Sequence, residues 1–143
     1  MMIRTVLITA TVAIGVTGVV AQTDALSERK AFMKKNGQHT KAVSAMVKGD
    51  APFDAAVVNA AFTQWSDTAA QLPKLFPDNS KSGDTRALPK IWEDRKGFDA
   101  HVAAFAKAAA ARPKDADSLK VAFPAVSKAC GDCHEGYRAA AKK

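Results

Sequence analysis

The amino-acid sequence predicts an all-α protein, an antiparallel four-helix bundle that forms one domain. After residue 21, no stretch alternates apolar and polar residues with the β-branched enrichment of strands, whereas the helix formers alanine and lysine are abundant. Four segments have helical patterns, and two of their three connections are short, which favours antiparallel neighbours. The 143 residues suit a single domain, and a hydrophobic fraction of 48% excludes a disordered chain.

The first 21 residues predict a secretory signal peptide rather than part of the fold. Arg4 precedes an uncharged run of 16 residues, and Val19-Val20-Ala21 supplies small residues of the kind that a signal peptidase recognises. The run is shorter than the roughly 20 residues that span a bilayer, and no cluster of charges follows it. These two features argue against a retained membrane anchor. We therefore expect cleavage after Ala21 and a mature single-domain chain, Gln22–Lys143.

The first two helices are delimited by residues that favour helix ends. The first helix is expected over Ala25–Lys48, with Thr23 or Asp24 as its N-cap and Gly49 ending it. The second is expected over Asp54–Gln71, after Pro52-Phe53. The connection between them is short, so these two helices should lie antiparallel.

A long polar connection separates the second helix from the third. It covers Pro73–Pro89, which exceeds the usual length of a helix connection. We expect a solvated crossover, with a functional surface loop as the alternative. The third helix should begin near Pro89 and end before Arg112-Pro113. Its apolar residues recur at i, i+4 and i+7 on one face: Phe98, Val102 and Phe105.

The fourth helix carries the strongest chemical motif of the sequence. It is expected to start at Asp115 or Asp117 and to reach the C-terminus, with a kink or delay at Pro124. It contains the sequence Cys130-Gly131-Asp132-Cys133-His134. Residues at i, i+3 and i+4 share one face of a helix, so both thiols and the imidazole should point into one pocket.

The Cys-x-x-Cys-His motif predicts the covalent attachment of one haem c. Two thiols at this spacing can add to the two vinyl groups of a haem, and the next histidine reaches the iron from one side. A disulfide between them would close almost no loop. A thioredoxin-like redox pair would need a βαβ context, and a zinc site would need further ligands, whereas His39 and His101 lie on other helices. Chance occurrence is the remaining alternative.

The residue on the other side of the iron decides what the haem does. A low-spin electron carrier fills this position with methionine or histidine, whereas a gas-binding haem leaves it open. Met33 and Met46 are the methionines of the mature chain, and their spacing places them on different faces of the first helix. Met33 shares a face with Arg29, which could pair with a haem propionate, and with Gly37, which leaves room for the ring. Core packing of Met33 and a solvated Arg29 are the alternatives.

The sequence resembles the cytochrome c′ family, the class II cytochromes c. The segment Ser127–Arg138 is similar to the haem-binding end of that family, which lies near the C-terminus. The C-terminal placement of the motif and the following Tyr137-Arg138 are specific to the family. Further matches are Val47-Lys48-Gly49, Pro52-Phe53-Asp54-Ala55 and Pro89-Lys90-Ile91-Trp92, so the resemblance covers essentially the whole mature chain.

The resemblance implies a ligand set and a branch of the family. Segments 32–37 and 72–78 resemble the low-spin branch, the cytochromes of the c-556 type, in which a methionine on the first helix binds the iron. The resemblance implies covalent attachment at Cys130 and Cys133, with His134 as proximal and Met33 as distal ligand. It further implies that Arg29 contacts a propionate and that Arg138 lies against the proximal side of the imidazole. The alternative is a high-spin cytochrome c′ with an open distal face that binds nitric oxide or carbon monoxide.

The expected function is that of a periplasmic one-electron carrier rather than an enzyme. No histidine is placed as a distal acid–base group, which argues against a haem peroxidase. The net charge of +7 favours redox partners with an acidic surface, although Lys34-Lys35 and Lys142-Lys143 also fit ordinary solvated charge. The sequence has no platform of aromatic and basic residues of the kind that binds nucleic acid, so nucleic acid is not an expected partner. Membrane contact is expected only through membrane-bound redox partners. The sequence leaves open whether two bundles form a homodimer through their first helices, as many relatives do.

Overall fold

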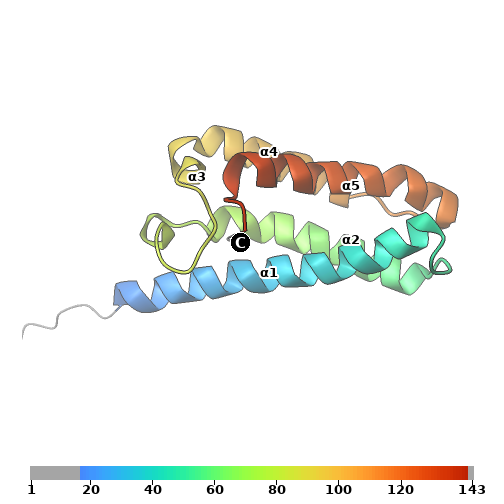
Figure 1. Ribbon diagram of the computed structural model, residues 1–143, viewed down its shortest axis with the longest axis horizontal. Helices are drawn as coiled ribbons and strands as arrows, with labels where there is room; N and C mark the ends of the chain where they lie inside the picture. The colour runs from blue at the N-terminus through green and yellow to red at the C-terminus, as the bar shows by residue number, and fades with distance from the viewer. Residues whose placement is uncertain (1–16, 142–143) are drawn as a thin grey trace, which may run out of the picture.

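The computed structural model describes residues 17–141 and has five α-helices in that range (Figure 1). No strand occurs among these residues, apart from an isolated bridge between Ala87 and Arg138. The all-α prediction is therefore confirmed. The helices are α1 (Thr17–Lys48), α2 (Ala55–Gln71), α3 (Lys90–Glu93), α4 (Arg95–Ala109) and α5 (Ala116–Tyr137), with short 3-10 turns η1 (Leu72–Lys74) and η2 (Asp78–Ser80).

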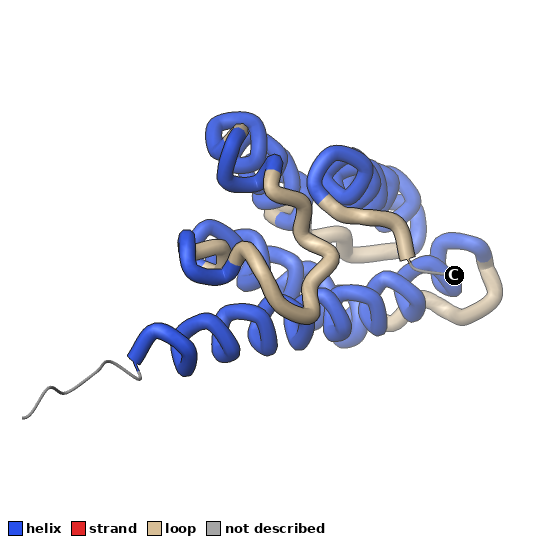
Figure 2. Tube along the Cα trace, turned by 60° about the vertical axis from the view of Figure 1, so that its left-hand side comes forward, coloured by secondary structure: helices blue, strands red, loops and turns tan. Residues whose placement is uncertain are grey.

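The four long helices form two antiparallel pairs that pack on each other. Helix α1 packs on α2 and α5, and α4 packs on α2 and α5. Figure 1 shows α1 and α2 as one layer and α4 and α5 as the other, and Figure 2 shows the connection between α2 and α3 crossing one end of the bundle. No helix among residues 17–141 is long and apolar enough to span a membrane.

The start of α1 lies further upstream than the sequence predicts. The helix begins at Thr17, eight residues before the predicted Ala25, and it ends at Lys48 as predicted. Gly49 follows with a φ of 83°, a left-handed conformation that glycine adopts without a Cβ clash. Residues 1–16 of the predicted signal peptide lie outside the described residues, so cleavage after Ala21 stays a prediction.

The second helix begins as the sequence predicts because Asp54 caps it. The Asp54 carboxylate accepts hydrogen bonds from the backbone N–H groups of Ala56 (2.8 Å) and Val57 (3.1 Å). Two of the otherwise unpaired donors at the helix start are thereby satisfied.

The third predicted helix is divided in two, which corrects the prediction of one continuous helix between Pro89 and Arg112. Asp94 leaves the helical conformation with φ −118° and ψ 59°. Its carboxylate accepts a hydrogen bond from the backbone N–H of Gly97 and thus caps α4. Aspartate side chains compete with the helical backbone in this way, and a periodicity argument does not detect it.

Helix α5 starts where predicted but ends before the C-terminus. Asp115 and Ser118 form a reciprocal capping box at its start, so Pro124, which lies inside the helix, does not delay it. Arg138 turns to an extended conformation, and the chain then pairs with Ala87 of the long connection. The predicted continuation of the helix to the chain end is therefore wrong.

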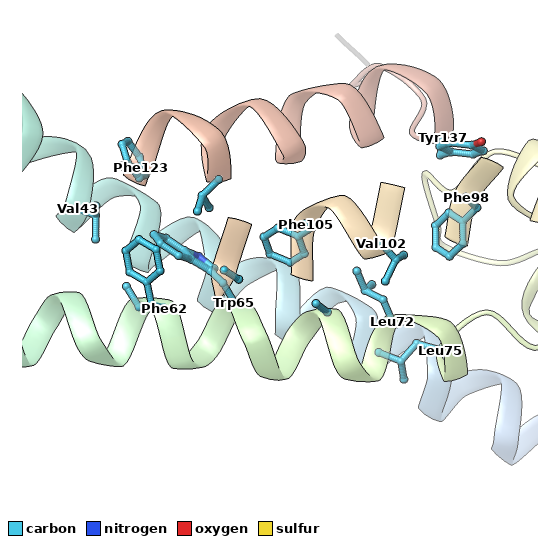
Figure 3. Packing of buried hydrophobic residues seen from close by; sticks show 14 of the residues in the cluster. Val43, Phe62, Trp65, Leu72, Leu75, Phe98, Val102, Phe105, Phe123 and Tyr137 are labelled. Carbon is cyan, nitrogen blue, oxygen red and sulfur yellow. The ribbon is translucent and has the colours of Figure 1, made fainter. Parts of the chain in front are cut away.

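The apolar core runs along the bundle (Figure 3), and several of its residues also line a cavity. At one end, Trp65 packs against Phe62 and Phe123, with ring centroids 4.9 Å and 6.1 Å apart. At the other end, Phe98 packs edge-on against Tyr137 at 5.6 Å. Burial of each such aromatic side chain contributes roughly 1.5–3 kcal/mol to folding. The predicted apolar face of the third segment is confirmed, because Phe98, Val102 and Phe105 are all buried.

Candidate haem site

The thiols and the imidazole of the predicted motif lie on the last turns of α5. Cys133 and His134 line a cavity of about 430 Å³, which is within the size range of small-molecule and cofactor sites. Cys130 lies one turn earlier, packs against the core and is not among the cavity-lining residues. Both cysteines are free and half-buried. The prediction that both thiols and the imidazole point into one pocket is therefore confirmed for Cys133 and His134 but not for Cys130.

Helix α1 supplies another wall of the same cavity. The residues that line it recur at helical spacing: Leu26, Arg29, Lys30 and Met33. Met33 is half-buried, with its side chain packed beside the core. Met46 also packs against the core but does not line the cavity. The prediction that at most one of the two methionines faces the pocket agrees with this arrangement.

The remaining wall is largely apolar, and part of it comes from the long connection. Its apolar members come from five elements or segments: Leu72, Phe76, Ala87, Ile91, Phe98 and Tyr137. Asp84, Thr85 and Arg86 also line the cavity, so the connection is more than a solvated crossover. The sequence does not indicate that these residues line a cavity, since segment 81–86 has only the composition of a polar loop.

Arg29 is buried, so the alternative of a solvated helix charge is wrong. Its guanidinium donates hydrogen bonds to the carbonyl of Leu75 (3.1 Å) and to the hydroxyl (3.1 Å) and carbonyl (3.3 Å) oxygens of Ser80. It also stacks 4.5 Å from the ring centroid of Phe76. Burial lowers the pKa of Arg29, yet an arginine stays protonated in proteins. Arg29 makes no ion pair within residues 24–141, so an uncompensated positive charge borders the cavity.

Burial also sets the protonation of the proximal residues. It raises the pKa of the Cys130 thiol, and burial together with the neighbouring Cys130 raises the pKa of the Cys133 thiol. Burial, together with the positive charges of Arg138 and Arg86, lowers the pKa of His134 below its ordinary value. His134 is therefore neutral at pH 7, which leaves a ring nitrogen free to bind a metal ion. Arg138 itself is exposed and lines the cavity.

The end of α5 is held by the last residues of the long connection and by Asp94, which precedes α4. The backbone N–H of Leu88 donates to the carbonyl of Tyr137 at 3.0 Å, and that of Ala139 donates to the carbonyl of Arg86 at 2.8 Å. The Tyr137 hydroxyl donates to the Asp94 carboxylate at 2.8 Å. Burial and this bond raise the pKa of Tyr137 to about 12, and the same bond lowers the pKa of Asp94. Sequence patterns did not single out Asp94.

The residues around the cavity fit a haem. A haem with two thioether links needs two thiols, an imidazole for the iron, apolar surface for the ring and positive charge for its propionates. Cys130, Cys133 and His134 offer the first three groups, the apolar wall offers the surface, and Arg29 is a buried cation beside it. Among residues 24–141, no group of three or more histidine, cysteine or carboxylate side chains is placed to hold a metal ion by itself, which argues against a zinc site.

Comparison with known proteins agrees with this site. The family model for cytochrome c′ matches residues 24–138. The chain is 41% identical to a cytochrome c-556 and 46% identical to a cytochrome c′, both from Rhodopseudomonas palustris, with 96–97% of this chain and 97–98% of each relative covered. The solved structure of cytochrome c′ from Rhodopseudomonas palustris superimposes with a TM-score of 0.78 at 45% identity, covering 83% of this chain and 98% of that one.

The fold and the site define a four-helix-bundle haem protein of the c type. The chain belongs to the cytochrome c′ family, as the resemblance of its sequence implies. The cofactor of the chain is therefore haem c, bound covalently, and the sequence has a single Cys-x-x-Cys-His motif to attach it.

Proposed function

We propose that the chain is a periplasmic one-electron carrier with a low-spin haem c, attached at Cys130 and Cys133 and ligated by His134 and Met33. The haem supplies an iron that alternates between the ferrous and ferric states. Methionine as the second ligand favours the ferrous state and so raises the reduction potential. The observation that carries the proposal is that Met33 of α1 lines the same cavity as His134 of α5.

The surrounding residues suit electron transfer in other respects. The apolar wall excludes water from the ring, so little solvent has to reorganise when the charge of the iron changes. The charge of Arg29 borders the cavity and stabilises the ferrous state, and the same guanidinium is available to a propionate. Its three bonds to Leu75 and Ser80 leave further N–H groups for that contact.

The test compares Met33→Ala with Met46→Ala, since both methionines lie on α1 and pack against the core. In the ferric protein, Met33→Ala should convert a low-spin visible spectrum to a high-spin one, because it removes the distal ligand. Met46→Ala should leave the spectrum unchanged, since Met46 lies outside the cavity lining. A wild-type protein that is already high-spin, with no change in Met33→Ala, would contradict methionine ligation.

A second candidate is a high-spin cytochrome c′ whose open distal face binds nitric oxide or carbon monoxide. The 46% identity with a protein named cytochrome c′ favours it. Mixing the reduced protein with carbon monoxide separates the two functions. Prompt and stoichiometric binding supports the gas-binding candidate, whereas slow binding that becomes fast in Met33→Ala supports the carrier.

The expected partners are redox proteins with an acidic surface, met in the periplasm after export. Three cationic side chains at the cavity are accessible from solvent: Lys30, Arg86 and Arg138. Lys30 pairs with Asp84, whose side chain is almost fully exposed, so this ion pair contributes little and yields readily to another carboxylate. A positive rim of this kind speeds encounter with an anionic surface.

A further inference from the structure

We propose that Tyr137 and Asp94 are positioning residues for the proximal ligand: their hydrogen bond, for which Gly97 makes room, fixes the end of α5 that carries His134. The inference rests on the proposed function only through His134 as the proximal ligand. It holds whether Met33 binds the iron or leaves it open. Neither Asp94 nor Gly97 lines the cavity, so both would act through Tyr137.

Tyr137 occupies a place from which it can set the orientation of His134. It is the last residue of α5 and follows His134 by three positions, so the two side chains lie on one face of the helix and line the same cavity. The last turn of a helix has unpaired carbonyl groups and frays unless other groups hold it. His134 lies in that turn, and its carbonyl accepts a hydrogen bond from Arg138 at the end of the helix.

One short segment, residues 88–94, holds Tyr137 at both its backbone and its side chain. Leu88 donates to the Tyr137 carbonyl at 3.0 Å, and Asp94 accepts from the Tyr137 hydroxyl at 2.8 Å. The phenol ring is packed edge-on against Phe98 at 5.6 Å and His101 at 5.5 Å, and only 4% of Tyr137 is exposed. Two separate attachments and a packed ring therefore restrict rotation at the end of α5. Since the pKa of Tyr137 is raised to about 12, its hydroxyl keeps its proton at neutral pH.

Gly97 is the residue that permits this contact. A Cβ at position 97 would lie 2.2 Å from Oδ2 of Asp94 and 2.5 Å from the hydroxyl oxygen of Tyr137. Both distances are shorter than any van der Waals contact, so a side chain would displace one or both of the bonded oxygens. Glycine within a helix is disfavoured relative to alanine. At position 97 the lack of space for a Cβ explains why glycine is present.

The effect on the haem follows from general metal-site chemistry. Residues that fix the orientation of a metal-binding histidine, without touching the metal, alter both the affinity and the electronic properties of the site. In this chain the orientation is set through the helix backbone, because Tyr137 anchors the turn that contains His134. Loss of the Tyr137–Asp94 bond should therefore change the plane of the imidazole without removing the ligand.

The test uses the ferric holoprotein and the ¹H NMR shifts of its haem methyl groups, whose spread depends on the orientation of the axial imidazole. Tyr137→Phe removes only the hydroxyl, and Gly97→Ala keeps both bonded groups but pushes them apart. Gly136→Ala is the matched control, because it adds the same methyl to a helical glycine of α5 that has nothing within 4 Å of the added Cβ. Circular dichroism at the same temperature checks that each variant is folded.

We expect Tyr137→Phe and Gly97→Ala to change the spread of the haem methyl shifts in the same sense, with Gly136→Ala like the wild type. A purely structural role would lower the melting temperature and leave the shifts of the folded protein unchanged. The proposal is overturned if Tyr137→Phe has the wild-type pattern, or if Gly97→Ala is indistinguishable from Gly136→Ala. A wild-type spectrum without signals of a ligated imidazole would instead contradict His134 as the ligand, which separates this failure from a failure of the proposed role of Tyr137 and Asp94.

Discussion

Arg29 is a buried guanidinium whose hydrogen-bond partners are neutral oxygens and whose flat face rests on Phe76. A buried charge is costly unless hydrogen bonds or an opposite charge compensate it, and here the compensation comes from the segment 75–80. The same contacts attach that segment to α1. Arg29 therefore has two roles that can be separated: its hydrogen bonds shape one side of the cavity, and its charge acts on whatever the cavity holds.

Replacing Arg29 separates these roles through the reduction potential. Arg29→Gln removes the charge that stabilises the ferrous state, so the midpoint potential should fall. A unit charge about 10 Å away at an effective dielectric constant of about 20 corresponds to a fall on the order of 70 mV for a one-electron couple. Spectroelectrochemical titration measures it. Arg29→Lys retains the charge but loses the planar fork, and should keep most of the potential.

If the midpoint potential falls equally in Arg29→Lys and Arg29→Gln, the cause is displacement of segment 75–80 rather than loss of charge. An unchanged potential in a folded Arg29→Gln protein would contradict an electrostatic role altogether.

At the scale of the helices, local capping chemistry marks where α2, α4 and α5 begin. Asp54 satisfies two N–H groups of α2, and the Asp115–Ser118 capping box starts α5. Such helix starts can be predicted from a sequence because the capping residue and the first turn of its helix are neighbours in the chain.

The cap of α2 predicts a defined stability loss. Asp54→Ala leaves the N–H groups of Ala56 and Val57 without their side-chain acceptor, and should cost about 1 kcal/mol in the free energy of unfolding. Asp54→Asn retains an acceptor oxygen and should stay within a few tenths of a kcal/mol of the wild type. Denaturant titration followed by circular dichroism measures both. Equal losses in the two variants would show that charge, not capping, is responsible.

The break at Asp94 marks the limit of sequence prediction at this scale. The spacing of Phe98, Val102 and Phe105 correctly predicts the buried face of α4. It does not reveal that Asp94 leaves the helix, because the second partner of its carboxylate, Tyr137, is 43 residues away along the chain. The spacing of residues along α1 also does not predict the burial of Arg29, because its partners, Leu75 and Ser80, are 46 and 51 residues away along the chain. In contrast, the spacing of Cys130, Cys133 and His134 is local, and the motif could be recognised from the sequence.

At the scale of the whole molecule, the cavity is assembled from α1, the long connection, α4 and α5, which are far apart in sequence. The connection contributes Thr85, Arg86 and Ala87, and the bridge between Ala87 and Arg138 attaches this part of the connection to the chain beyond the end of α5. This assembly also gathers positive charge. Lys30 of α1, Arg86 of the long connection and Arg138 after the end of α5 all line the cavity, where the carboxylate of Asp84 pairs with Lys30.

That positive entrance should make electron transfer depend on salt and on the sign of the reactant. The rate constant for oxidation by ferricyanide, an anion, should fall as ionic strength rises, whereas that for a cationic cobalt complex should rise. Arg86→Gln should lower the ferricyanide rate about two- to fivefold at low salt and flatten its salt dependence. Lys107→Gln is the matched control, since it removes the same charge from an exposed position at the end of α4 that does not line the cavity. Stopped-flow measurement gives the ferricyanide rate constant of each variant. A local steering surface requires a larger loss of rate in Arg86→Gln than in Lys107→Gln. Equal losses in the two variants would mean that only the net charge of the protein matters.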